Sequence, residues 1–235
     1  MSQFQKITLQ GNDAAKFLQG QLTINTSKLS TQLLPCAISD LKGRIAFGLW
    51  VNQTDDVFTL ITASDCMEAL SLHIKKYGVF SKFTQSTPAP VYPCVENGLP
   101  TFTDDQSKAE FEAWATASIQ TGNYWITQKT QGLFQPQELR LHQRGGVDYD
   151  KGCYLGQEVI ARLWFKASPK AYLHRVLMDK QVADGAKIDK VQVVNSAPRG
   201  DGFDALVVGS PEQIAKVGTV LALPDELMGD VARVK

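Results

Sequence analysis

The sequence lacks the features that would assign it at once to several large classes of protein. Its 24 basic and 24 acidic residues leave no net charge, so no overall field draws the chain to nucleic acid or to an anionic membrane. The longest apolar run, Ile45–Val51, is far shorter than the roughly 20 residues that a membrane helix needs. Met1–Gly20 has polar residues every few positions and no apolar core, which argues against a secretory signal. We therefore expect a cytoplasmic protein that does not enter a membrane.

Histidine and cysteine are also scarce. The chain has three histidines, and its four cysteines form no CxxC pair. His142 and His174 are the histidines nearest to Cys153, and neither stands at the spacing of a zinc motif. We expect reduced thiols and no metal site built by this chain alone. The cysteines are Cys36, Cys66, Cys94 and Cys153.

Hydrophobic periodicity predicts a sheet in the first third of the chain. Apolar and other side chains alternate along Arg44–Val51, as in a half-buried strand. Met67, Leu70 and Ile74 recur at helical spacing and predict a helix after the strands. The strands predicted here are Lys6–Leu9, Leu33–Ser39, Arg44–Val51 and Val57–Thr62.

The middle of the chain is predicted to combine loops with short elements. Pro88–Pro100 holds four prolines, which favours a loop or linker with one short edge strand at most. Tyr124–Thr127 has the composition of a strand, and Pro136 suits the first position of a helix over Gln137–His142. Apolar spacing predicts a further helix over Tyr154–Trp164.

The composition changes after Ser168–Pro169. Asp, Gly and Pro turns separate a series of β-rich segments, which predicts a small antiparallel barrel or sandwich. We therefore predict two domains, residues 1–167 and residues 168–235. The β-rich segments are Ala171–Met178, Lys190–Asn195, Ala205–Val208 and Ile214–Leu223.

Asp150–Glu158 is the segment most suggestive of chemistry, because it places Cys153 beside Lys151 and between two glycines. A lysine neighbour and a helix N-terminus both stabilise a thiolate, so Cys153 is a candidate reactive thiol. An isolated cysteine is also commonly a small buried hydrophobe, and composition alone does not decide between the two. Gly152 and Gly156 interrupt a helical pattern, which predicts close approach of another chain or a ligand.

These residues carry a resemblance to a known family. Lys151–Glu158 (KGCYLGQE), followed by Val-Ile-Ala-Arg, resembles the signature of the YgfZ-type folate-binding proteins. Those proteins are similar in fold to the aminomethyltransferase (T-protein, GcvT) of glycine cleavage. Further matches follow the family's order along the chain: Phe17–Thr23, Asp40–Arg44, Lys75–Lys82 and Phe134–Leu139.

The resemblance implies an α+β, aminomethyltransferase-like folate-binding fold with a ferredoxin-like core over residues 1–167. It implies a C-terminal antiparallel β-barrel over residues 168–235. It also implies a monomer that binds tetrahydrofolate, or a one-carbon derivative, in a central cavity. Its partners would be iron–sulfur client proteins, including those that thiomethylate tRNA, and its link to tRNA would be indirect. Cys153 would be required as a catalyst, a ligand of a shared cluster or a redox handle, and the resemblance leaves these roles open.

The resemblance also assigns folate-binding residues. The family's two stacking aromatics fall at Phe4 and at Tyr124, or the adjacent Trp125. A folate tail or tRNA phosphates need cations, and the basic residues around the cysteine motif are candidates, although a solvated charged face is the alternative. The remaining predicted folate contacts are Arg144, Lys151, Gln157, Glu158 and Arg162.

The sequence departs from the family pattern at three places. Thr130 stands where an acid is expected to bind the pterin, and Glu138 is a possible substitute. The strand Ile45–Trp50 carries no carboxylate, so no group is available to position an aminomethyl group and we predict no glycine-cleavage activity. The middle part, residues 85–120, is short for the family. A one-carbon transferase that uses Cys153, or an interaction module with a vestigial cavity, are the competing hypotheses.

Overall fold

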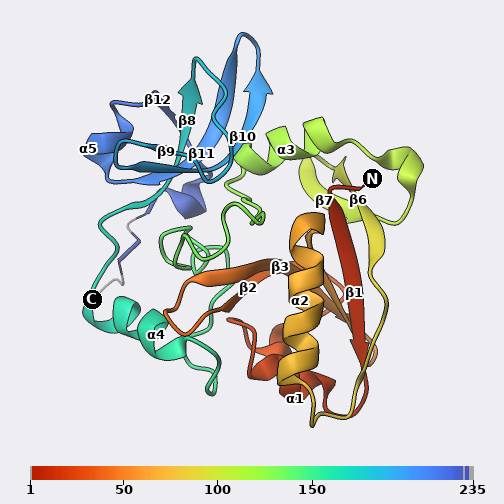
Figure 1. Ribbon diagram of the computed structural model, residues 1–235. Coiled ribbons are helices and arrows are strands. Elements are labelled where there is room, and N and C mark those ends of the chain that lie inside the picture. Colours follow the sequence, from red (N-terminus) through yellow and green to blue (C-terminus); the bar gives the residue numbers. More distant parts are fainter. Residues whose placement is uncertain (1, 230, 233–235) are drawn as a thin grey trace.

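The computed structural model describes residues 2–229, 231 and 232 and contains two antiparallel sheets (Figure 1). Helices α1 and α2 lie with the N-terminal sheet, whereas α3 lies between the two sheets. A long irregular segment, residues 121–156, runs through the middle of the molecule and joins the parts. This mixed arrangement of helices and antiparallel sheets confirms the predicted fold class.

The N-terminal sheet has seven strands in the order β2-β3-β4-β1-β6-β7, with β5 paired to β1. Its central strands alternate buried and half-buried residues because one face covers the core. The four strands predicted in the first third of the chain are confirmed as β1 to β4. The strands are β1 (Phe4–Gln10), β2 (Leu34–Ser39), β3 (Ile45–Thr54), β4 (Val57–Ala63), β5 (Thr84–Gln85), β6 (Ala89–Glu96) and β7 (Leu99–Thr103).

The helices use their apolar faces to cover the sheets. α2 buries Met67, Leu70 and Ile74, as their helical spacing predicts, and Lys75 and Lys76 in its last turn suit the negative end of the helix dipole. The helices are α1 (Ala14–Gln19), α2 (Ser64–Tyr77), α3 (Phe111–Gln120), α4 (Gln157–Lys166) and α5 (Pro211–Ile214). Short 3-10 turns cover Thr26–Lys28, Gln106–Lys108 and Asp225–Leu227.

Aromatic rings fill the centre of the core. Trp114 of α3 is fully buried and packs against Phe4, with ring centroids 4.8 Å apart. Trp125 packs against Trp114 at 5.2 Å, and Trp50 packs against Phe4 at 5.8 Å. Edge-to-face and tilted contacts of this kind add to the free energy of burial. The irregular central segment is thus fixed by its aromatic side chains, without strand pairing.

The C-terminal sheet has five strands in the order β12-β8-β11-β10-β9 and is curled into a half-barrel. It has its own small core around Val176, Val193 and Val207. Asp204 is fully buried there and is held by Arg175, whose Nε lies 2.9 Å from Oδ1. The strands are β8 (Tyr172–Met178), β9 (Lys187–Ile188), β10 (Val191–Arg199), β11 (Gly202–Gly209) and β12 (Thr219–Leu221).

The prediction of a loop with at most one short edge strand over Pro88–Pro100 is wrong, because two strands cover this stretch. β6 and β7 form a hairpin there, joined by Asn97 and Gly98, which both have positive φ. Asn-Gly is the sequence favoured by a type I′ hairpin turn, and it is the signal that outweighs the prolines. Pro100 lies in β7, an edge strand in which its missing N–H is tolerated.

Two short elements predicted in the central segment are also wrong. Tyr124–Thr127 is irregular, because the N–H of Trp125 donates to the side chain of Asn195 instead of to a strand. Gln137–His142 forms a series of turns and no helix, since Arg140 adopts φ 55°. Among the described residues, no helix is long and apolar enough to cross a membrane.

Candidate functional site

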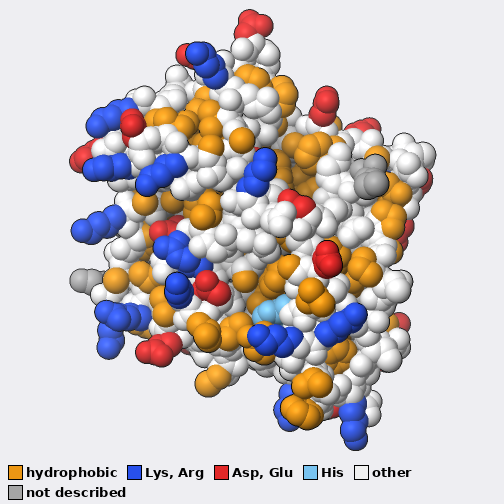
Figure 2. Space-filling view, in the orientation of Figure 1, with side chains coloured by type: hydrophobic (Ala, Val, Ile, Leu, Met, Phe, Trp, Pro, Cys, Tyr) orange, Lys and Arg blue, Asp and Glu red, His pale blue; other side chains and the backbone are white. Residues whose placement is uncertain are grey.

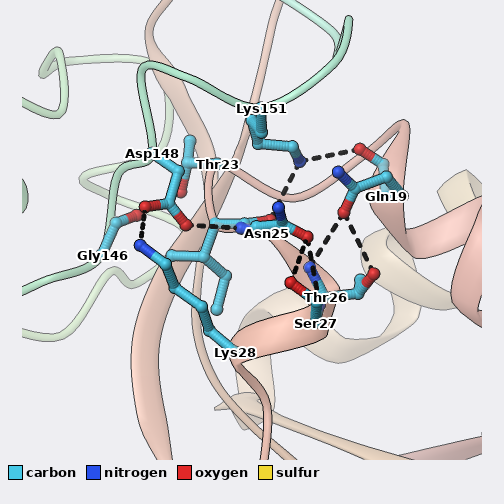
Figure 3. Close-up of polar contacts among 10 residues, drawn as sticks. Gln19, Thr23, Asn25, Thr26, Ser27, Lys28, Gly146, Asp148 and Lys151 are labelled. Carbon is cyan, nitrogen blue, oxygen red and sulfur yellow. Dashed lines mark hydrogen bonds and ion pairs between the residues drawn. The ribbon is translucent and has the colours of Figure 1, made fainter.

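Lys151 of the cysteine motif is a buried side chain, only 7% exposed. Its ammonium donates to three backbone oxygens, those of Gln19 (2.7 Å), Leu22 (2.6 Å) and Ile24 (2.9 Å). These carbonyls belong to the last residue of α1 and to the loop that follows it, and Gln19 and Leu22 fall within the family match Phe17–Thr23 (Figure 3). Lys151 therefore joins two motifs that lie more than a hundred residues apart.

The positive charge of Lys151 interacts with backbone carbonyls inside the protein. Burial lowers its pKa to about 8, so the side chain stays protonated at neutral pH. The ammonium has three donors, which the three carbonyls match, and it also lies 4.7 Å from the centre of the Tyr154 ring. The hydrogen bonds of the Lys151 ammonium thus go to the end of α1 and the loop after it.

Asp148 reinforces the same junction. Its Oδ2 accepts from the backbone N–H of Asn25 at 2.7 Å, and Oδ1 pairs with Lys28. The backbone N–H of Asp148 donates to the oxygen of Thr23, whose hydroxyl donates to Gly146 at 2.6 Å. Residues 146–151 are thus held along the loop that leaves α1 (Figure 3).

Gly156 packs against the turn of a second motif, Asp40–Arg44. Its φ is +78°, and a Cβ placed on it would lie 2.3 Å from the oxygen of Asp40. Gly43 of that turn is equally close to the start of α4, since a Cβ there would lie 2.9 Å from Val159. At Gly156 the predicted close approach is made by the chain's own Asp40–Arg44 turn.

Cys153 is exposed and lies before α4, not in its first turn. Gly156, the residue before α4, is left-handed and separates the thiol from the helix N-terminus. The neighbouring Gly152 has open space around it. The other three cysteines are buried, and burial raises the pKa of each of their thiols. Cys153 is the thiol that this fold presents to the outside.

Two predicted folate aromatics border one groove, here called the aromatic groove. Phe4 and Trp125 line it together with Phe111, and its volume is about 440 Å³. The groove lies at the N-terminal end of α2, near Ser64, between the N-terminal sheet and the C-terminal half-barrel. Phe4 and Trp125 are almost fully buried, at 1% and 6% exposed, so Phe111 is the aromatic ring that keeps exposed surface there.

The other predicted aromatic, Tyr124, borders a small central void and lies beside Arg144, which lines a separate cleft of about 650 Å³, here called the Arg144 cleft. The guanidinium lies 5.6 Å from the Tyr124 ring and bonds to the side chain of Asn123. Trp50 and Phe102 supply aromatic walls. An arginine with a neutral amide as its partner can still receive an anion. The structure thus separates Phe4 and Trp125, which line the aromatic groove, from Arg144, which lines the other cleft.

Little space remains between the two clefts. The small void there, about 10 Å³, is bordered by Trp50, Tyr124 and Trp125. Gly48, on the strand that carries no carboxylate, packs against Ile126, and a Cβ on it would lie 2.7 Å from Ile126 Cγ1. A larger side chain at Gly48 would need Ile126 to move.

Thr130, at the position where the family places an acid, serves the local backbone. It is fully buried, and its hydroxyl accepts from the N–H of Thr127 at 2.9 Å. Glu138, the suggested substitute, accepts from the N–H of Gln135 at 2.8 Å, and burial raises its pKa. Glu138 does not line either cleft.

The basic residues of the motif region do not form one patch. Arg140 donates to the oxygens of Leu173 and Gly229 and so ties the central segment to β8 and the C-terminal region. Arg162 and Glu158 are both exposed on α4 and form no ion pair with each other. Gln157 donates to the oxygen of Lys151 at 3.3 Å and stabilises the motif loop.

Metal ligands are not grouped in the part of the chain that the structure describes: no cluster of three His, Cys, Asp or Glu side chains is found there. Exposed apolar side chains do gather at the end of the molecule where α2 ends, with Val79 68% and Phe80 97% exposed. Figure 2 shows hydrophobic side chains among basic side chains at that lower end.

Comparisons with known proteins agree with this fold. No protein-family model matches the chain. The tRNA-modifying protein YgfZ of Klebsiella pneumoniae is 27% identical over 71% of this chain and 67% of the relative, and that of Escherichia coli O157:H7 is 28% identical over the same shares. An uncharacterized protein of Haemophilus influenzae is 27% identical over 86% of this chain and 84% of its own length.

A solved structure extends the comparison. Aminomethyltransferase T of the glycine cleavage system from Bartonella henselae superposes with a TM-score of 0.67, at 13% identity, over 89% of this chain and 76% of that chain. At this identity the likeness establishes the fold alone. The resemblance to YgfZ-type proteins, with an aminomethyltransferase-like fold, is therefore confirmed.

Proposed function

We propose that this chain has a YgfZ-like role: it supports tRNA modification as a folate-binding accessory of iron–sulfur enzymes and is not itself a one-carbon transferase. The named relatives and the aminomethyltransferase fold support the YgfZ-like role. The folate and iron–sulfur parts of the proposal rest on the site, as follows.

The observation that carries the proposal is the way the motif displays Cys153. Lys151 and Gly156 fix the loop from both sides, the first by three carbonyls and the second by the Asp40–Arg44 turn. The thiol between them is exposed, and the ammonium beside it in sequence is engaged elsewhere. A rigidly held, outward-facing thiol is suited to react with a partner protein or to act as a ligand of a group that the partner holds.

Reduced folate fits the aromatic groove better than the centre of the fold. Phe111, which is half-buried, borders a cavity of about 440 Å³ that the buried Phe4 and Trp125 also touch, whereas the central void is about 10 Å³. Arg144 lies in the second cleft, where it would bind the carboxylates of a folate tail if the ligand entered from that side.

The alternative, a one-carbon transferase with Cys153 as nucleophile, is less well supported. The groove lies at the start of α2. The motif loop bonds to Gly20, and the neighbouring Gln21 bonds to His73, which lies about 12 Å further along that helix. Figure 1 places the segment that leads into α4 at the opposite end of the N-terminal part from the start of α2. A nucleophile must lie within hydrogen-bond reach of the reacting atom.

Complementation tests the proposal. A strain that lacks its own YgfZ protein would receive the wild type, Cys153→Ala or Cys94→Ala, and the thiomethylated nucleosides of its tRNA would be measured. We expect rescue by the wild type and by the buried-cysteine control, and none by Cys153→Ala. Equal rescue by all three would overturn the assignment of Cys153.

A further inference from the structure

The end of α2 carries apolar side chains that the fold leaves exposed, here called the Phe80 patch. They are Leu72, Tyr77, Val79 and Phe80. Single exposed hydrophobic side chains are ordinary on a protein surface, but these four come from the last turns of one helix and the turn that follows it. A group of this kind marks a surface that contacts another molecule.

Hydrogen bonds hold the turn that carries Phe80. The N–H of Ser81 donates to the oxygen of Gly78 at 2.9 Å. The N–H of Lys82 donates to Asp13 Oδ2 at 2.7 Å, and the N–H of Asp13 donates to the oxygen of Lys82 at 3.2 Å. The exposure of the Phe80 ring is therefore set by the fold of the backbone around it.

The same turn buries a second phenylalanine. Phe83 packs against Phe17 of α1, with ring centroids 4.9 Å apart, whereas Phe80 remains 97% exposed. An aromatic ring that already stands in a fixed position loses little conformational freedom when it binds. Phe80 thus has the properties of an interface anchor, which is most often an aromatic or arginine side chain.

Three exposed lysines accompany the Phe80 patch, Lys75 and Lys76 in the last turn of α2 and Lys82 after the turn (Figure 2). None of the ion pairs among the described residues involves them. The Asp13 carboxylate bonds to the backbone N–H described above, and Glu68 lies about 10 Å before Lys75 along α2. In a chain without net charge, this end is locally basic and complements an acidic surface.

The Phe80 patch adjoins the cysteine motif. Tyr77 stacks on His73 with ring centroids 4.5 Å apart, and His73 Nε2 lies 2.8 Å from Gln21 Oε1. The oxygen of the residue before Gln21 accepts from the N–H of Leu155, which is two residues after Cys153. A macromolecule that covers the end of α2 is thus brought beside the exposed thiol.

We propose that the Phe80 patch docks an acidic face of the iron–sulfur client protein and so holds that client beside Cys153. Phe80 enters an apolar pocket of the client, and the three lysines face its carboxylates. This inference rests on the proposed function and deepens it, because it names the surface that receives the client and the chemistry of that client's surface. An anionic membrane also attracts lysines, but a single protruding ring beside a thiol fits a protein pocket better than an extended apolar face in lipid.

Binding of the full chain to a client tests the inference. The probe is the purified iron–sulfur enzyme that thiomethylates tRNA in the complementation strain, and interferometry would measure its association and dissociation rates. The variants are Phe80→Ser, and Lys75→Glu combined with Lys76→Glu. The matched controls, at exposed positions of the C-terminal sheet, are Val220→Ser, and Lys187→Glu combined with Lys190→Glu. Thermal melting verifies that each variant is folded.

The two kinds of variant should change different rates. We expect Phe80→Ser to raise the dissociation rate and weaken binding by about 30-fold, as the loss of an aromatic anchor does. Reversal of Lys75 and Lys76 should lower the association rate by about 10-fold and reduce its dependence on salt, since these lysines steer the encounter. The controls should bind as the wild type does.

Client binding that is unchanged in both patch variants, or absent in the wild type, would overturn the inference, while rescue by the wild type and not by Cys153→Ala would still support the proposed function. Binding that depends on Phe80, together with equal rescue by the wild type and Cys153→Ala, would support the docking surface and overturn the role of Cys153. Vesicles of phosphatidylcholine and phosphatidylserine are the second probe. Binding to them that depends on Phe80, without client binding, would assign the patch to a membrane and overturn the inference.

Discussion

Gly156→Ala is the sharpest test of how the motif loop is built. The residue has φ +78°, and a non-glycine residue in the left-handed region costs about 1–2 kcal/mol. The new Cβ would also lie 2.3 Å from the oxygen of Asp40, which accepts from the N–H of Gly43 at 3.0 Å. Displacing that turn adds a further penalty of about 1–3 kcal/mol, as for other overpacked sites.

We therefore expect Gly156→Ala to lower the free energy of unfolding by about 2–5 kcal/mol, measured by urea denaturation with an unchanged m-value. Substitutions at two other glycines of the same region separate the cost of the left-handed backbone from the cost of the contact with the turn. Gly145 has φ +72° with nothing near its Cβ position, so Gly145→Ala should show the backbone cost alone. Gly152 has neither constraint, and Gly152→Ala should change stability by less than about 0.5 kcal/mol. Equal losses for Gly156→Ala and Gly145→Ala would refute the packing of Gly156 on the Asp40–Arg44 turn.

Three further predictions follow from the structure. Lys151→Met leaves three buried carbonyls without their donor and should lower the free energy of unfolding by about 2–4 kcal/mol, measured by urea denaturation. The control Lys166→Met, at an exposed lysine, should leave this free energy unchanged. A neutral result for Lys151→Met would contradict its structural role. The folded pKa of Asp184, about 6, lies above its ordinary value of 3.8, so the folded state binds the proton more tightly and wild-type stability falls as pH rises from about 4 to 6. In Asp184→Asn the free energy of unfolding should lack this dependence on pH and should be about 1–2 kcal/mol higher than in the wild type at pH 7, allowing for solvent screening. Chemical denaturation at several pH values measures it, and the same pH dependence in both proteins would disprove the burial of this charge. Phe80→Ser, at a side chain that is 97% exposed, should leave the melting temperature unchanged but reduce complementation, and full rescue would exclude Phe80 as a partner contact.

Much of the fold is predictable from the sequence because its signals are local. The alternation along Arg44–Val51 and the helical spacing of Met67, Leu70 and Ile74 depend only on near neighbours, and both are confirmed. Asn97–Gly98 was an equally local turn signal, which four prolines in one stretch concealed. The central segment offers no such pattern, since Trp125 is held by ring packing and by Asn195 from another sheet.

The candidate site could be predicted only in part, because its contacts join distant residues. The sequence places Lys151 next to Cys153, but the direction of a long side chain depends on which carbonyls the fold brings within reach. The match of Phe17–Thr23 to the family was the available signal, since it marked the loop that Lys151 binds. Asp65 and Asp184 lie more than a hundred residues apart and carry no shared motif, so only the structure brings them into one groove.

Counting the reactive thiols tests the central claim most directly. The folded protein would be mixed with a thiol reagent such as Ellman's reagent, with and without saturating tetrahydrofolate. The account predicts one rapidly reacting thiol, Cys153, three slow ones, and no protection by folate, because the thiol faces outward and the ligand lies in the aromatic groove. Absence of a fast thiol, or strong protection of Cys153 by folate, would contradict it and would favour a thiol that acts on the folate itself.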